Sequence, residues 1–233
     1  MVRKFEDEIS ARRRELTALL RVILVIALLC LSMAVHAGGA KIWSGEELYY
    51  TCAACHGSKG EGLTPRHAPK IAGLEAWYLE RQINNYKAGI RGNHPGDLYG
   101  SQMILFARTL GNDDEVVQLA RYIASLPRTP ARQTIKGDLG RGGEIYATCT
   151  DCHGQRGEGN KDSDAPRLAG TDDWYLASQL RNFRAGALGY SDQDRLGKQM
   201  ADSVRNPLID DASIMDVVAY INFLGTDDST SKR

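Results

Sequence analysis

Apolar residues follow a helical period in several segments beyond residue 40. One apolar stripe covers residues 75–88, and another begins near Asn112 and stops at Pro127. Upstream of both, Ser44 followed by Glu47 forms a capping box, which predicts that a helix begins there. No segment shows the alternation of apolar and polar residues that is typical of a β-strand. The pattern therefore predicts an all-α fold.

The same pattern occurs twice, with a period of 97 residues. The residues that recur in register include Cys52/Cys149, Cys55/Cys152, His56/His153, Gly62/Gly159, Pro69/Pro166, Trp77/Trp174, Gln82/Gln179 and Met103/Met200. A helix cap recurs near the end of the second copy, at Asp210 or Asp211. A period this long indicates two globular domains instead of short solenoid units. We assign the domains to residues 38–126 and 138–233, and a linker to residues 127–137.

Residues 1–37 carry the features of a secretory signal peptide. A basic flank precedes an apolar run over residues 22–35, and Ala37 ends a small-residue cleavage site. The run is short for a membrane-spanning helix, which needs about 20 apolar residues. Cys30 lies in this run behind Leu29, which is not the small residue that lipoprotein processing requires. We expect cleavage and export to the periplasm, with an uncleaved membrane anchor as the open alternative.

The composition narrows the class of protein. Hydrophobic residues make up 42% of the chain and charged residues 25%, as in ordinary globular proteins. The 29 basic and 29 acidic side chains balance, and no basic stripe predicts a nucleic-acid partner. Five cysteines are too few for a disulfide scaffold, and four of them form two tight pairs.

Each copy contains Cys-x-x-Cys-His, the attachment motif of c-type haem. The motif residues are Cys52, Cys55, His56, Cys149, Cys152 and His153. Two sulfurs three residues apart lie on one side of a helical turn, so both can form thioethers with one porphyrin, and the histidine can offer a nitrogen to the iron. Zinc motifs usually lie some 15–20 residues apart, a thioredoxin-like dithiol accompanies a βαβ pattern, and a plain disulfide leaves the histidine unexplained. We therefore expect two covalently bound haem c groups.

A methionine lies 47 residues after each motif histidine, at Met103 and Met200. The equal spacing predicts that both methionines are the sixth iron ligands, so that the metal ligands are His56 and Met103 in one copy and His153 and Met200 in the other. His67 and His94 compete for this role in the first copy, but neither has a histidine counterpart, and we interpret both as surface residues. Methionine and histidine ligation raises the reduction potential and leaves no open iron position, which suits electron transfer.

From residue 41 to 225 the sequence resembles class I cytochromes c, specifically the dihaem cytochrome c4-like group. The resemblance rests on both haem motifs and on segments such as Pro-Lys-Ile-Ala-Gly, Trp-Tyr-Leu-Glu-Arg-Gln, Tyr-Lys-Ala-Gly and Gln-Met. It implies two tandem class I cytochrome c domains, each wrapped around one covalently bound haem. It also implies that the carbonyls of Pro69 and Pro166 accept a hydrogen bond from the motif histidines. Gly45 and Gly142 would let the first helix of each copy cross closely against the last.

The resemblance also implies a function. Such proteins are periplasmic electron carriers and not enzymes, and they often carry electrons from the cytochrome bc1 complex to a terminal oxidase. One alternative is the dihaem subunit of a periplasmic dehydrogenase, such as a sulfide-oxidising flavocytochrome or an alcohol dehydrogenase. A dihaem peroxidase is a further alternative, but it needs two dissimilar haem environments, which the near-identical repeats disfavour. Membrane contact is expected only if the N-terminal segment stays attached.

Overall fold

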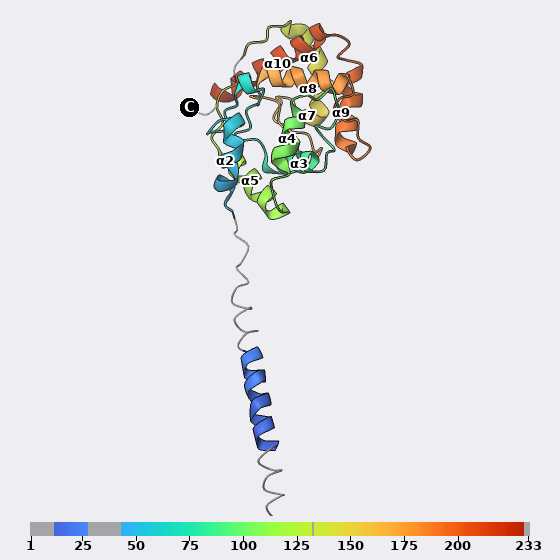
Figure 1. The fold of residues 1–233 in the computed structure, drawn as a ribbon. Helices are drawn as coiled ribbons and strands as arrows, with labels where there is room; N and C mark the ends of the chain where they lie inside the picture. The colour runs from blue at the N-terminus through green and yellow to red at the C-terminus, as the bar shows by residue number, and fades with distance from the viewer. Residues whose placement is uncertain (1–11, 28–42, 132, 231–233) are drawn as a thin grey trace, which may run out of the picture. The chain divides into compact units, whose positions relative to one another are not determined.

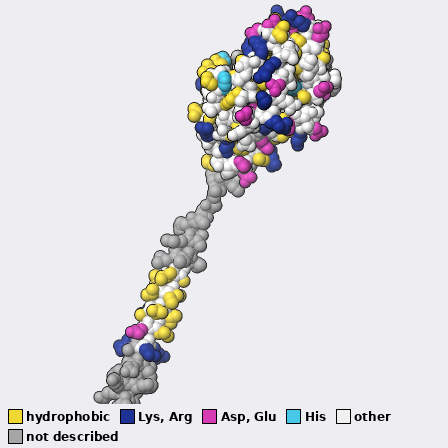
Figure 2. Space-filling view, turned by 90° about the vertical axis from the view of Figure 1, so that its right-hand side faces the viewer, with side chains coloured by type: hydrophobic (Ala, Val, Ile, Leu, Met, Phe, Trp, Pro, Cys, Tyr) yellow, Lys and Arg dark blue, Asp and Glu magenta, His cyan; other side chains and the backbone are white. Residues whose placement is uncertain are grey.

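The structure is a computed structural model that describes residues 12–27, 43–131 and 133–230, with the backbone alone for residues 226–230. The chain divides into two units, Met1–Ile42 and Trp43–Arg233. In the smaller unit, residues 12–27 form a helix whose apolar side chains are exposed (Figure 2). None of the described helices is both long and apolar enough to cross a membrane. Cys30 and the predicted cleavage site at Ala37 lie outside the described residues.

The first half of the larger unit, which we call the N-terminal domain, is built from helices (Figure 1). They are α2 Gly45–His56, the 3₁₀ helix η1 Thr64–Arg66, α3 Ala76–Lys87, α4 Gly100–Ala107 and α5 Asp113–Ser125. The predicted capping box starts α2, because the backbone N–H of Glu47 donates to Ser44 Oγ at 3.2 Å and that of Ser44 donates to Glu47 Oε2 at 2.9 Å. The predicted start of α5 is also confirmed, since Asn112 Oδ1 accepts from the backbone N–H of Glu115 at 2.9 Å.

The second half, which we call the C-terminal domain, repeats this order with two differences, the first of which is that a turn replaces the 3₁₀ helix η1. Its helices are α6 Leu139–Tyr146, α7 Thr150–His153, α8 Asp173–Arg184, α9 Arg195–Arg205 and α10 Asp211–Thr230. Two helices, α6 and α7, stand where the N-terminal domain has the single helix α2. Between them the backbone N–H of Cys149 donates to the Tyr146 carbonyl at 2.8 Å, in a turn tighter than the α-helix. Each cysteine motif still ends on a helix.

Helices α4 and α9 were missing from the helices that the sequence predicts. In α4, four apolar residues follow one another from Met103 to Phe106, so no one-sided stripe exists. Leu105 is 71% exposed and Phe106 is 40% exposed, although both are apolar. Hydrophobic periodicity reveals a helix only where the exposed face is polar, and here the exposed face of α4 is apolar as well.

The structure confirms the all-α fold for the part of the chain that it describes. Its only β-type pairings there are two isolated bridges, Leu63 with Ala68 and Asn160 with Ala165. In each domain the first and last helices lie side by side, α2 with α5 and α6 with α10 (Figure 1).

Glycine allows these helix crossings to be close. A Cβ on Gly45 would lie 2.6 Å from the Cβ of Tyr122 on α5, and a Cβ on Gly142 would lie 2.9 Å from the Cβ of Tyr220 on α10. Real Cβ atoms essentially never approach so closely. The crossing that the resemblance implied is therefore present in both domains, and it fixes α2, which carries the first cysteine motif, and α6, which directly precedes the second.

A buried carboxylate fastens the linker to the C-terminal domain. Asp173, at the start of α8, is fully buried and accepts hydrogen bonds from the backbone N–H of Ile135 at 2.7 Å and from Thr134 Oγ1 at 3.1 Å. On the other side, Lys70 Nζ donates to the carbonyl of Thr129 at 2.5 Å. The segment between the domains is thus bonded at both of its ends.

Candidate functional site

The cysteine motifs lie at the ends of α2 and α7. Cys52 and Cys55 are three residues apart on α2, so their side chains share one face of the helix. Cys149 and Cys152 form the second pair, and all four thiols are free and partly buried. Burial raises the pKa of Cys52 and of Cys149, which keeps these thiols protonated. The described residues hold no group of three or more acidic, cysteine and histidine side chains placed to bind a metal ion, as a structural zinc site would require.

Each motif histidine is fixed by a backbone carbonyl. His56 Nδ1 lies 2.8 Å from the Pro69 carbonyl oxygen, and His153 Nδ1 lies 2.8 Å from that of Pro166. Burial lowers the pKa of both imidazoles, while these hydrogen bonds act in the opposite direction. A neutral imidazole that donates from Nδ1 keeps a lone pair on Nε2. This is the tautomer that a metal ligand needs.

Glycines in the loop after each motif allow the proline carbonyl to approach the motif histidine. The backbone N–H of Gly62 donates to the His56 carbonyl at 2.8 Å, and Gly62 has φ +80°. A Cβ there would lie 2.5 Å from the backbone nitrogen of Lys70, so only glycine lets the two loop arms meet. Gly159 repeats this arrangement with φ +81°. The recurrence of these glycines in the sequence thus has a local steric reason.

Two tyrosines that the sequence analysis passed over complete the loops. Tyr49 donates from its hydroxyl to the Gly57 carbonyl at 2.6 Å, and Tyr146 donates to the Gly154 carbonyl at 2.8 Å. Both are buried, and burial raises the pKa of both phenols. The two positions are 97 residues apart, so the repeat register alone could have revealed them.

The predicted sixth ligands lie on the two helices that the sequence did not predict. Met103 belongs to α4 and Met200 to α9, and each packs against the core of its own domain. Of the two competing histidines, His67 is exposed, borders the same cavity as Met103 and stacks on Tyr99 with 3.8 Å between ring centroids. His94 does not line this cavity; its Nδ1 accepts from the backbone N–H of Gly96 at 3.0 Å.

One continuous cavity of about 490 Å³ joins the two sets of residues. Its walls include the motif and methionine residues of both domains: Cys52, Cys55, His56, Met103, Cys149, Cys152, His153 and Met200. Each half therefore offers two thiols, a neutral imidazole and a thioether inside a largely apolar wall. This donor set fits haem c, which needs two thioether bonds and two axial ligands.

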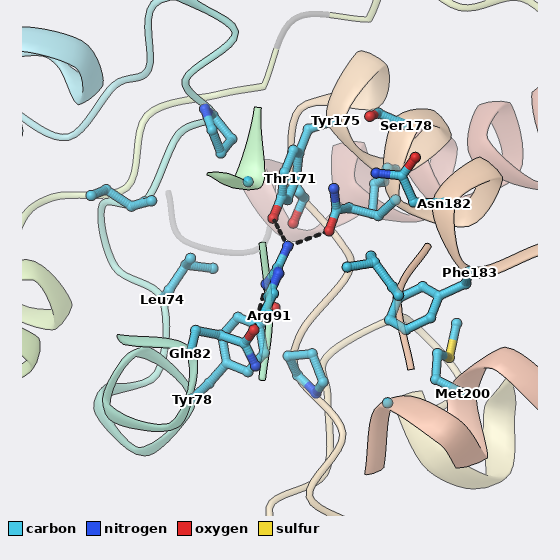
Figure 3. A pocket seen from close by; sticks show the side chains of 18 of the residues that line it. Leu74, Tyr78, Gln82, Arg91, Thr171, Tyr175, Ser178, Asn182, Phe183 and Met200 are labelled. Carbon is cyan, nitrogen blue, oxygen red and sulfur yellow. Dashed lines mark hydrogen bonds between the residues drawn. The ribbon is translucent and has the colours of Figure 1, made fainter. Parts of the chain in front are cut away.

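A polar cluster crosses the cavity where the domains meet (Figure 3). Arg91 of the N-terminal domain donates to Tyr175 Oη at 3.0 Å, and it also bonds Gln82 of its own domain and Gln179 of the other. Its Nε has no partner. The sequence analysis missed Arg91, because the equivalent position of the second copy holds Leu188.

Comparison with known proteins agrees with this geometry. The family model for cytochrome c matches residues 42–127 and again residues 139–224. Cytochrome c4 of Azotobacter vinelandii is 32% identical over 195 residues, which cover 79% of this chain and 91% of that protein. Among solved structures, reduced recombinant cytochrome c4 from Pseudomonas stutzeri has a TM-score of 0.59 and 27% identity, covering 76% of this chain and 95% of that one.

Two further relatives have names that mention a redox partner or complex. A thiosulfate dehydrogenase electron acceptor from Stutzerimonas stutzeri is 29% identical and is covered over 82% of its length, with 74% of this chain. The cbb3-type cytochrome c oxidase subunit FixP of a Bradyrhizobium species is 33% identical, but the match covers 59% of this chain and 49% of that subunit.

The doubled family match and the likeness to cytochrome c4 over 79% of this chain show the family and its cofactor content together. The chain belongs to the cytochrome c family, in its dihaem cytochrome c4-like group, and is an electron carrier with two covalently bound haem c groups.

Proposed function

We propose that this protein carries single electrons in the periplasm, from a quinol-oxidising complex such as cytochrome bc1 to a terminal oxidase. When bound, each haem c holds one electron by cycling between ferric and ferrous iron. Cys52 and Cys55 attach the first haem, and His56 and Met103 ligate its iron. The second haem is attached by Cys149 and Cys152 and ligated by His153 and Met200.

The observation that carries this proposal is the doubled donor set in a single cavity. Because Nδ1 of His56 and of His153 is held by a carbonyl at 2.8 Å, the orientation of each ring is fixed by the protein itself. A site that does not rearrange exchanges electrons without a slow structural step. The shared cavity supports transfer between the two domains, so that a donor and an acceptor can use different ones.

The methionines support an oxidase as the acceptor. A thioether ligand stabilises ferrous iron, which raises the potential toward that of the late part of a respiratory chain. Met103 and Met200 also occupy the iron position that oxygen or peroxide would need. The likeness to FixP, named as an oxidase subunit, agrees with this direction. The signal-peptide features of residues 1–37 support the periplasm as the compartment.

A second candidate function is to accept electrons from a periplasmic dehydrogenase. The relative named as a thiosulfate dehydrogenase electron acceptor favours it, because the match covers 82% of that protein. A sulfide-oxidising flavocytochrome is a donor of the same kind. In this case the protein would receive its electrons from the dehydrogenase instead of from the bc1 complex.

Two rate measurements separate these functions. The purified holoprotein is reduced and mixed with membranes that contain a terminal oxidase, and its oxidation is followed optically. In parallel, the oxidised protein is offered to reduced bc1 complex and to thiosulfate dehydrogenase with thiosulfate. Fast oxidation by the membranes and fast reduction by the bc1 complex are expected. Reduction by the dehydrogenase alone would replace the first function with the second.

A further inference from the structure

Arg91 is a buried cation whose protein partners are all neutral. Its side chain lies in the loop after α3, and the residue is only 8% exposed. Its two terminal nitrogens donate to Gln82, Tyr175 and Gln179, and its carbon Cζ lies 4.9 Å from the ring centroid of Tyr86. No carboxylate forms an ion pair with it within the described residues, although several other arginines there have one.

An arginine side chain stays charged in proteins, and burying a charge without a counter-ion is strongly unfavourable. The Nε of Arg91 is a further buried donor, and it has no hydrogen-bond partner. A carboxylate is the group that satisfies both conditions, because it supplies a negative charge and accepts from a guanidinium. The holoprotein brings such groups to this cavity, since each haem c carries two propionates.

We propose that Arg91 binds a propionate of the haem in the N-terminal domain and makes this haem the one with the higher potential. Arg91 belongs to that domain and packs on its Tyr86, while Gln179 and Tyr175 hold the far end of the guanidinium across the boundary (Figure 3). A fixed positive charge beside one haem stabilises its ferrous form relative to the ferric form. Leu188 stands at the equivalent position of the other domain, so the second haem has no such cation.

This inference rests on the haem sites of the proposed function. Its test replaces residues of the first copy with those at the equivalent positions of the second. Arg91→Leu installs the residue that the second copy has at this position. Arg81→Ser does the same for the neighbouring arginine Arg81, which crosses the domain boundary but already pairs with Asp164 at 3.3 Å. Both variants are made as full-length holoproteins, and bound haem is counted first.

Optical redox titrations at several pH values then give two potentials for each protein. The haems are distinguished by the NMR signal of the axial Met103 methyl group, assigned from its loss in Met103→Ala. In Arg91→Leu we expect the potential of the N-terminal haem to fall, because the fixed positive charge is lost. We also expect this potential to become more dependent on pH, because the propionate can then take up a proton. Arg91→Lys should fall between the wild type and Arg91→Leu, and Arg81→Ser should titrate as the wild type does.

The inference is overturned if Arg91→Leu keeps both wild-type potentials, if only the C-terminal haem shifts, or if Arg81→Ser shifts both haems as strongly. Should Arg91→Leu fail to bind two haems, Arg91→Gln removes the charge while keeping a polar side chain, and the same outcomes apply. A wild-type protein without methionine ligation would instead contradict the proposed function, which distinguishes the two failures.

Discussion

The two domains agree around their cysteine motifs and differ where they meet each other. In both, the hydrogen bond between the motif histidine Nδ1 and a proline carbonyl is 2.8 Å long. Tyr49 and Tyr146 each donate a hydrogen bond to the glycine carbonyl that follows the motif histidine. At the boundary, in contrast, Arg91 has no counterpart. The comparison teaches that duplication preserved what each haem needs locally, while the domain interface became specialised on one side.

Two equivalent loop residues share one backbone conformation but make different side-chain contacts. His67 and Asp164 are equivalent residues with nearly equal positive φ angles of 51° and 54°. Asp164 accepts from Arg81 across the boundary, through its side chain at 3.3 Å and through its carbonyl at 2.8 Å. His67 instead uses its ring: it stacks on Tyr99 of its own domain and lies edge-on to Trp174 of the other, with 6.4 Å between centroids. The loop conformation was kept, and the side chains diverged.

The surfaces over the methionine helices differ as well. The N-terminal domain exposes the apolar residues Leu105 and Phe106 on α4, where the C-terminal domain has Asp202 and Ser203 on α9. Elsewhere, positive and negative side chains are interspersed over the face shown in Figure 2, and no basic patch dominates it. The exposed surface of α4 is therefore apolar at positions where that of α9 is polar.

The largest expected effect comes from removing one predicted axial ligand at a time. Met103→Ala and Met200→Ala should each abolish the methionine–iron absorption band of one haem and leave the other intact. The potential of the altered haem should fall by on the order of 0.1–0.3 V, a fraction of the roughly 0.8 V that axial ligands can set. Redox titration of both variants checks this. Two unchanged potentials in either variant would remove that methionine from the ligand set.

The next effect concerns the linker, which the C-terminal domain holds through the fully buried carboxylate of Asp173. Asp173→Ala places the residue of the equivalent position, Ala76, at a site where three backbone N–H groups and a hydroxyl donate to the carboxylate. We expect a loss of about 2–4 kcal/mol in the free energy of unfolding. Guanidinium unfolding followed by circular dichroism measures it. The exposed Asp202→Ala is the matched control, and an equal loss in both would contradict the structure.

Helix crossings should respond alike in the two domains. Gly45→Ala and Gly142→Ala each bring a Cβ into the backbone of the last helix, so we expect a destabilisation of about 1–3 kcal/mol for each. Gly140→Ala is the control, since its new Cβ meets only the Asp138 side chain, at 3.2 Å. The same unfolding measurement applies, and a tolerated alanine at Gly45 or Gly142 would mean that the crossing is looser than described.

The two tyrosines give a smaller effect with a defined pH dependence. Tyr49→Phe and Tyr146→Phe each lose one hydrogen bond, worth about 0.5–1.5 kcal/mol. Burial raises the pKa of both phenols above the ordinary value of 10.0, so the unfolded chain ionises first as the pH rises. Their contribution to stability is therefore complete below pH 10 and decreases above it. Unfolding at several alkaline pH values should show a shallower decrease in each variant; an unchanged slope would contradict this.

The smallest effect is expected at the Arg81–Asp164 pair. The two side chains are 22% and 47% exposed, so water screens their attraction. Arg81→Ser should cost at most about 1 kcal/mol of stability. A loss of several kcal/mol would contradict this expectation, because a pair screened by water cannot contribute so much.

Much of this structure was predictable because the sequence repeats. The motif residues, the capping box at Ser44 and the cap at Asn112 are local signals, and local hydrogen bonds realise them. Helix α4 was missed because apolar residues also occupy its exposed face, whereas α9, whose apolar residues Met200, Ala201 and Val204 do share one face, was passed over. Arg91 was missed for a different reason: a search for recurring residues cannot find the residue that does not recur. Its role depends on contacts with Tyr175 and Gln179, more than 80 positions away in the chain.

The most direct test of the central claim is an optical redox titration of the purified holoprotein, with the ferric spectrum recorded at long wavelength. Two steps at positive potential, together with the methionine–iron band, are the predicted result for two haems ligated by histidine and methionine. A strongly negative step, or a missing methionine band, would contradict the account, because Met103 or Met200 would then not be a ligand.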